Sequence, residues 1–204
     1  MPLTSELRRG IDQIRDYLYG GGYPDPLTNA EQLSFLFFFY LIEGMDADNL
    51  MQAKATKRDY ESMFAGDWKL RNPLNAPKQD QETVPAERLK WSQWKVMAGT
   101  PLVQWLRDEV FPFYAAVAER SAMNFMDGAR LGIDEPTVLA QVINLIDKLR
   151  LDAEERRRRR ARLRGGRAWE RRDHGLSEVV RQLHHPVLLH LQIQGTIKIE
   201  IEVE

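Results

Sequence analysis

The sequence predicts a mainly α-helical protein: an N-terminal helical bundle, then a short arginine-rich segment and a C-terminal stretch that can form a β-hairpin. Apolar residues recur at helical spacing through the first 150 residues, one run of large apolar residues predicts a buried central helix, and the composition changes near Asp152. Of the 204 residues, 43% are hydrophobic and 29% are charged, which suits one or two globular domains.

The first helix is predicted from an amphipathic stripe that ends at a glycine triplet. The apolar positions are Leu3, Leu7, Ile11, Ile14 and Leu18. Their spacing of three or four residues places them on one helical face. Gly20–Gly22 should end this helix, because consecutive glycines leave the backbone too much freedom to continue it. A phosphate-binding loop is disfavoured, since such a loop follows a strand and this triplet follows a helix.

The second helix should be the buried centre of the bundle. Thr28 and Glu31 have the spacing of a capping box, which predicts a helix that begins there. Large apolar residues then fill positions 33–42 on every side, so we expect the helix over 29–43 to be buried all round. Four phenylalanines and a tyrosine in this run are more typical of core packing than of a cofactor site.

A polar helix is expected over residues 48–64, and a loop-rich linker over 66–84. The polar stretch includes Lys54, Lys57 and Arg58. Such a cluster is usually a solvated face, and contact with nucleic-acid phosphates is the alternative.

Two further helices are expected in the second half of the bundle. Trp91 and Trp94 can share one helical face. Thr100 followed by Pro101 predicts an N-cap and a proline at the first helical position. Pro112 should bend or interrupt that helix. The segment 134–136 should open the last helix, which carries apolar residues at helical spacing as far as position 149.

The charge distribution divides the chain into residues 1–151 and 152–204. Residues 1–150 carry 17 Lys and Arg against 21 Asp and Glu, whereas residues 151–172 carry 10 against 4. The basic segment contains five consecutive arginines: Arg156, Arg157, Arg158, Arg159 and Arg160. A run of this kind suggests contact with nucleic-acid phosphates. Beyond it, residues 187–193 and 197–203 alternate between apolar and other side chains, which predicts the two strands of a hairpin.

The sequence contains no complete catalytic or metal-binding constellation. It has no cysteine, so thiol nucleophiles and thiolate metal sites are excluded. The four histidines all lie after residue 172, and no acidic residue is spaced to complete a metal site with them. The N-terminus lacks a secretory pattern, and the longest apolar run, residues 35–42, is too short to span a membrane. We therefore expect a cytoplasmic protein without a membrane partner.

Six segments in order resemble the N-terminal domain of the methylase subunit of type I DNA restriction-modification systems. They are residues 11–18 (IDQIRDYL), 31–42 (EQLSFLFFFYLI), 60–64 (YESMF), 89–94 (LKWSQW), 106–112 (LRDEVFP) and 142–149 (VINLIDKL). No single segment is specific, and the resemblance rests on their order and spacing over about 140 residues.

The resemblance implies a helical domain that precedes an S-adenosylmethionine-dependent adenine-N6 methyltransferase domain. Such a methylase pairs with a specificity subunit and a second methylase subunit, and its helical domain helps to close the complex around DNA. The family's glycine-rich cofactor loop and its Asn/Asp-Pro-Pro-Tyr/Phe motif do not occur here. Asn72-Pro73-Leu74 is the nearest string and lacks the second proline and the aromatic residue. We therefore assign no catalytic, cofactor-binding or metal-binding residue and expect the chain to be inactive alone.

The chain departs from the family's pattern near Asp152, where the composition also changes. A shifted reading frame, a truncation or an unrelated fusion would explain both observations. The functional alternative is a genuine arginine-rich tail that binds DNA. A different class of function also stays open, namely a stand-alone helical module that binds nucleic acid through this tail.

Overall fold

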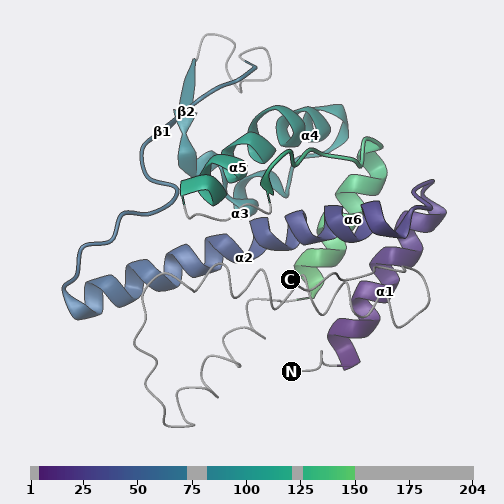
Figure 1. Ribbon diagram of the computed structural model, residues 1–204, viewed down its shortest axis with the longest axis horizontal. Coiled ribbons are helices and arrows are strands. Elements are labelled where there is room, and N and C mark those ends of the chain that lie inside the picture. The colour runs from purple at the N-terminus through teal and green to yellow at the C-terminus, as the bar shows by residue number, and fades with distance from the viewer. Residues whose placement is uncertain (1–4, 73–81, 121–125, 150–204) are drawn as a thin grey trace, which may run out of the picture.

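The computed structural model describes residues 5–72, 82–120 and 126–149, and over these residues the protein is mainly helical (Figure 1). The predicted mainly α class is therefore correct for this part of the chain. The arginine run and the predicted hairpin lie outside the described residues. None of the described helices combines the length and the apolar character that crossing a bilayer would require.

Helix α1 spans Ser5–Gly20 and presents the predicted stripe to the core. Leu7, Ile11, Ile14 and Leu18 are all buried. The helix ends at the glycine triplet, where Gly22 has a φ of +95° and the chain turns toward the next helix. Glycine adopts this left-handed backbone without the steric cost of a Cβ atom.

Helix α2 spans Pro26–Thr56 and begins earlier than the predicted capping box. Asp25 is the N-cap, and its carboxylate accepts hydrogen bonds from the backbone N–H groups of Leu27 and Thr28, at 3.3 and 3.1 Å. The Thr28 hydroxyl also donates to Asp25. The capping-box prediction was wrong because Pro26, whose fixed φ suits the first helical position, places the start of the helix three residues upstream of the expected residue 29.

Helix α2 also includes the first half of the segment 48–64, which was predicted to be a separate helix. It continues without a break to Thr56, and the chain then turns at Lys57, whose φ of +52° lies in the left-handed region. The middle of α2 is buried on every side as predicted. Its buried residues are Asn29, Ala30, Gln32, Leu33, Phe35, Leu36, Phe37, Phe38, Phe39, Leu41, Ile42, Met45 and Asp46.

The segment predicted as a linker contains a small β-ribbon. Strands β1 (Asp67–Lys69) and β2 (Thr83–Pro85) pair antiparallel, with Trp68 opposite Val84. Val84 is buried on the core, and Trp68 packs against it as a partly buried residue. Each strand has only three residues, too short for apolar alternation to reveal it in the sequence.

The second half of the bundle follows β2 through a 3₁₀ turn, Ala86–Leu89, and helix α3, Trp91–Trp94. The rings of Trp91 and Trp94 meet edge to face with centroids 4.7 Å apart, and both are buried. The predicted sharing of one face is confirmed.

Helices α4 (Gly99–Trp105) and α5 (Phe111–Arg120) are joined by a π-helical turn, Leu106–Val110. The predicted interruption near Pro112 takes the form of this turn. Helix α4 begins at Gly99, and no side chain caps it, so the prediction that Thr100 is an N-cap was wrong.

Helix α6 spans Pro136–Lys148, with Glu135 as its N-cap, as the segment 134–136 predicted. It packs against α1 and α4, and Figure 1 shows it crossing beside α1. A Cβ atom on Gly21 would stand 2.9 Å from Val138, so the two helices approach closely where α6 begins. Tyr23 adds a polar contact, because its hydroxyl donates to Asp134 at 2.6 Å.

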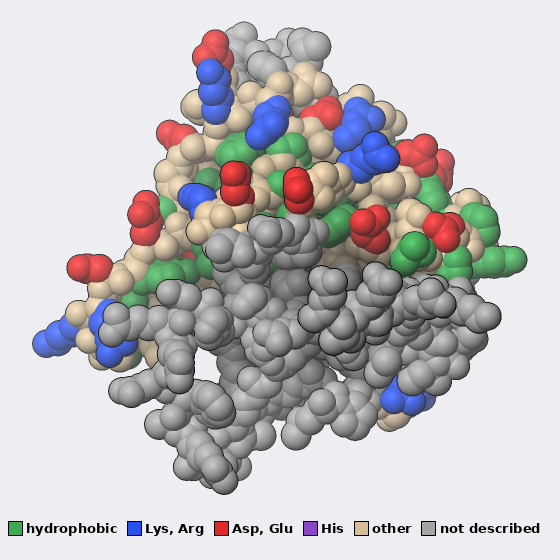
Figure 2. All heavy atoms as spheres, viewed as in Figure 1, with side chains coloured by type: hydrophobic (Ala, Val, Ile, Leu, Met, Phe, Trp, Pro, Cys, Tyr) green, Lys and Arg blue, Asp and Glu red, His purple; other side chains and the backbone are tan. Residues whose placement is uncertain are grey.

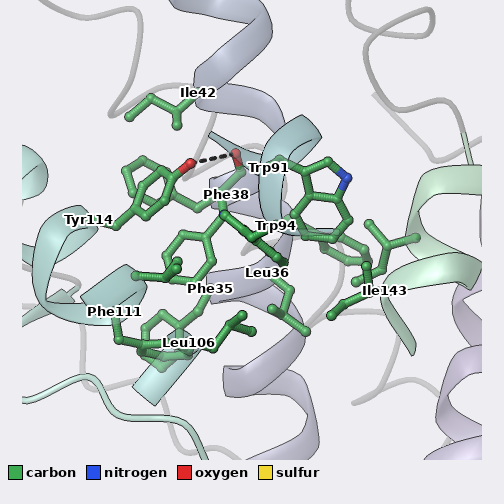
Figure 3. Close-up of a cluster of buried hydrophobic side chains, with 14 of the residues drawn as sticks. Phe35, Leu36, Phe38, Ile42, Trp91, Trp94, Leu106, Phe111, Tyr114 and Ile143 are labelled. Atoms are coloured by element: carbon green, nitrogen blue, oxygen red, sulfur yellow. Dashed lines mark hydrogen bonds between the residues drawn. The ribbon is translucent and has the colours of Figure 1, made fainter. Parts of the chain in front are cut away.

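The core is an aromatic cluster between α2 and α5 (Figure 3). The Phe39 ring stacks on Tyr114 at 4.3 Å and meets Phe111 edge to face at 5.0 Å. On another side of α2, Leu36 lies toward Trp94 and Ile143 in the same view. Helix α2 is therefore surrounded by the other helices along its middle, which explains its all-round apolar sequence.

Candidate nucleic-acid interface

Three of the predicted phosphate contacts lie together at the C-terminal end of α2, which we call the cationic end. Lys54 is in the last turn, Lys57 is the C-cap, and Arg58 follows it. The N–H groups of residues 57 and 58 both bond to the carbonyl of Ala53, which closes the helix. All three cationic side chains are exposed. Figure 1 shows this end of α2 extending beyond the other helices.

The cations of the cationic end are not held in ion pairs by other described residues. Within residues 5–72, 82–120 and 126–149, neither Lys54 nor Lys57 nor Arg58 forms an ion pair. Figure 2 shows basic side chains at the corresponding end of the molecule. Part of their role is local, because cations stabilise the negative end of a helix dipole. Exposed cations of this kind are also able to contact a phosphate backbone.

The position of this end depends on a buried carboxylate, Asp46. It accepts hydrogen bonds from the Tyr60 hydroxyl at 2.9 Å, the Ser62 hydroxyl at 2.6 Å and the Met63 N–H at 2.8 Å. Burial raises the pKa of Tyr60, and its bond to Asp46 adds to the effect, so the hydroxyl keeps its proton. These bonds return the chain to α2 directly after the cationic end.

A second buried carboxylate, Glu109, holds the base of the β-ribbon. It lies in the π-helical turn and is fully buried. It accepts from the Trp68 indole at 2.9 Å, from the Arg71 N–H at 3.0 Å and from the Asn72 N–H at 2.7 Å. Arg71 also lies over the Trp68 ring, 5.9 Å from its centroid. A carboxylate with this many donors is a structural acceptor, because its lone pairs are already engaged.

The described residues do not gather a catalytic or metal-binding constellation. In these ranges no three Asp, Glu or His side chains are grouped to hold a metal ion. Asn72, which begins the string nearest to the methylase motif, bonds through its side-chain amide to Asp108 at 3.2 Å. Its backbone N–H is bound to Glu109, so the residue takes part in the structural clamp.

Comparison of the chain with protein-family models, with curated proteins and with solved structures gives no match. The arginines predicted to contact phosphates, Arg156, Arg157, Arg158, Arg159 and Arg160, lie outside the described residues. The structure therefore brings together only the three cations of α2.

Neither buried carboxylate was predicted from the sequence. Asp46 has apolar neighbours on both sides, a pattern that hints at burial, whereas Glu109 follows Asp108 and has no such signal. The donors to both carboxylates lie 14 or more residues away in the sequence. Asp25 could have been recognised, since Asp25-Pro26 repeats the acidic residue and proline that correctly predicted the start of α6.

Proposed function

We propose that this chain is an assembly and DNA-clamping domain of the methylase subunit of a type I restriction-modification system, catalytically incomplete by itself. The full subunit would methylate adenine N6 with S-adenosylmethionine, in a complex with a specificity subunit, a second methylase subunit and DNA. The six ordered segments of the resemblance support the proposal. Five of them fall on helical elements, and residues 60–64 lie in the loop that follows α2.

The DNA-binding part of this proposal rests on the cationic end of α2. Three exposed cations without ion-pair partners among the described residues project from a helix that is otherwise anchored in the core. Cationic side chains bind phosphates without sequence preference, as a clamp requires, while base recognition in this proposal belongs to the specificity subunit.

A salt titration of DNA binding tests this part. The triple variant Lys54→Ala, Lys57→Ala and Arg58→Ala should bind a labelled duplex more weakly, and its slope of log affinity against log salt should be about 3 units shallower. A matched control removes three exposed cations elsewhere: Arg88→Ala, Arg120→Ala and Arg130→Ala. Equal losses for the two triple variants would contradict a role for the cationic end.

Two further measurements test the methylase assignment. The nucleotide sequence downstream of codon 152, read in all three frames, should encode the missing cofactor loop and the Asn/Asp-Pro-Pro-Tyr/Phe motif. The purified chain should transfer no labelled methyl group from S-adenosylmethionine to DNA. Transfer by this chain alone would refute the claim that it is catalytically incomplete.

The second candidate is a stand-alone helical module that binds nucleic acid through its arginine-rich tail. It is favoured by the ten Lys and Arg within residues 151–172. An isolated gene with no methyltransferase motif in any downstream frame would support this candidate over the first.

A further inference from the structure

One residue of the cationic end, Lys57, has a backbone conformation that L side chains rarely adopt. Its φ is +52° and its ψ is +39°, which lies in the left-handed region. Four other residues in the described ranges have a positive φ, and each of them is a glycine: Gly22, Gly66, Gly99 and Gly128. A Cβ atom disfavours this conformation, which is why glycine usually occupies the left-handed position that ends a helix. A lysine at position 57 therefore lowers the stability of the folded chain.

The turn at this position does not require a lysine side chain. The N–H groups of residues 57 and 58 both bond to the carbonyl of Ala53, and a glycine at position 57 would form the same backbone bond. The Lys57 side chain is exposed and forms no ion pair within residues 5–72, 82–120 and 126–149. The α2 dipole already has a cation in the last turn, Lys54. The contacts of the described residues therefore do not explain why a cation stands at position 57.

We propose that Lys57 is a phosphate-binding residue held in a strained backbone conformation, and that its ammonium group contacts a phosphodiester of duplex DNA. Residues in sparsely populated backbone conformations are concentrated at binding sites, where the surrounding structure holds them in place. An ammonium group is a compact charge with three donors, which suits a phosphate oxygen. This inference rests on the proposed DNA-clamping function, and it adds that Lys57 lowers stability while it increases the affinity for DNA.

The support for the strained residue comes from the buried carboxylate of Asp46. This carboxylate accepts hydrogen bonds from the Tyr60 and Ser62 hydroxyls at 2.9 and 2.6 Å, a few residues after the turn. On the other side of the turn, Lys57 follows directly on α2, whose middle is buried in the core. The backbone at position 57 is therefore fixed from both sides, so the conformation persists although it is unfavourable for lysine.

Two substitutions of Lys57 in the full chain separate its charge from its backbone strain. Lys57→Gly and Lys57→Gln both remove the charge, but only Lys57→Gly removes the Cβ atom. Both variants should make the slope of log affinity for a labelled duplex against log salt about 0.9 units shallower, the change expected for one phosphate contact. Lys57→Gly should melt about 2–4 °C above both Lys57→Gln and the native chain. Melting is measured in about 0.5 M salt, which screens the interaction of the lost charge with the helix dipole.

Two control variants isolate the two effects. Lys57→Arg keeps both the charge and the Cβ atom, so its salt slope and melting temperature should match those of the native chain. Arg58→Gly removes the neighbouring cation, which is exposed and does not have a positive φ. This variant should not raise the melting temperature, because glycine relieves no strain there.

The outcomes separate this inference from the proposed function on which it rests. If the triple variant of the cationic end has a shallower slope but the two Lys57 variants keep the native slope, the clamp stands and the phosphate contact of Lys57 is refuted. If Lys57→Gly melts no higher than Lys57→Gln, position 57 stores no strain and the inference is overturned. A native slope in the triple variant as well would refute the clamp itself. A lower melting temperature of Lys57→Gln at low salt, with a native slope, would assign the charge to the helix dipole alone and overturn the inference.

Discussion

At the scale of single residues, acidic side chains organise the loops of this bundle. Asp25 and Glu135 cap the starts of α2 and α6, while Asp46 and Glu109 gather donors from distant segments. On the surface, Asp147 receives the Lys95 ammonium at 2.8 Å and the Trp91 indole at 3.2 Å, which holds α3 against α6. Each of these carboxylates satisfies N–H or O–H groups that the turns of the chain would otherwise leave without a partner.

Replacement of the α2 cap is the first prediction. Asp25→Ala should lower the urea midpoint of unfolding with an unchanged m-value, because two backbone N–H groups at the helix start lose their acceptor. Asp59→Ala, an exposed position that caps no helix, is the control. An unchanged midpoint for Asp25→Ala would mean that Pro26 alone determines where the helix begins.

The pH dependence of the same cap has a definite sign. The hydrogen bonds from Thr28 lower the pKa of Asp25 below its ordinary value of 3.8. Because the pKa is lower in the folded state, the stabilisation is present above pH 3.8 and is lost as the pH falls through the folded value. The difference in midpoint between the native chain and Asp25→Ala should therefore shrink below pH 3.8.

The second prediction concerns the buried acceptor in the π-helical turn. Glu109→Gln should destabilise the protein by about 2 kcal/mol, because the amide group turns an N–H toward donors that need an acceptor. Urea unfolding measures the loss, and Glu119→Gln on the exposed surface is the control. Equal stability of the two variants would show that Glu109 is dispensable.

At the scale of elements, α2 unites a buried middle and an exposed end within one helix. Phe37→Asp should prevent folding, because an unpaired buried charge costs several kcal/mol and total stability is about 5–15 kcal/mol. Met51→Asp places the same charge on the same helix at a side chain that is 64% exposed, and should fold normally. Circular dichroism and thermal melting distinguish the two, and a folded Phe37→Asp variant would contradict the central position of α2.

The packing of α1 against α6 gives a prediction with a neighbouring control. Gly21→Ala should destabilise the bundle by about 1–3 kcal/mol, because the new Cβ would stand 2.9 Å from Val138 and 3.2 Å from the Tyr17 carbonyl. Gly20→Ala meets no atom within 4 Å and should be neutral or slightly stabilising. Adding Val138→Ala to Gly21→Ala should recover part of the loss if the side-chain contact is its main cause.

At the scale of the whole molecule, the stability of the helical body should not depend on the basic tail. Deletion of residues 153–204 should leave the melting temperature nearly unchanged, because α6 ends at Lys148 and the aromatic core lies entirely before it. The truncated chain should lose most of its salt-sensitive DNA binding. If about six tail cations engage phosphates, the tail should contribute about −5 to the full chain's slope of log affinity against log salt. Unfolding on deletion would make the tail an integral part of the fold.

The sequence by itself determined the helical class, the end of α1 at the glycine triplet, the buried middle of α2 and the start of α6 at Pro136. These features follow from local signals, since apolar periodicity, glycine freedom and the fixed φ of proline act within a few residues. Tertiary structure alone decided that α2 continues to Thr56 and that a β-ribbon forms between Asp67 and Pro85. It also decided that Asp46 and Glu109 are buried acceptors. These features depend on partners far apart in the chain, such as Trp68 and Glu109, which only packing brings within hydrogen-bonding distance.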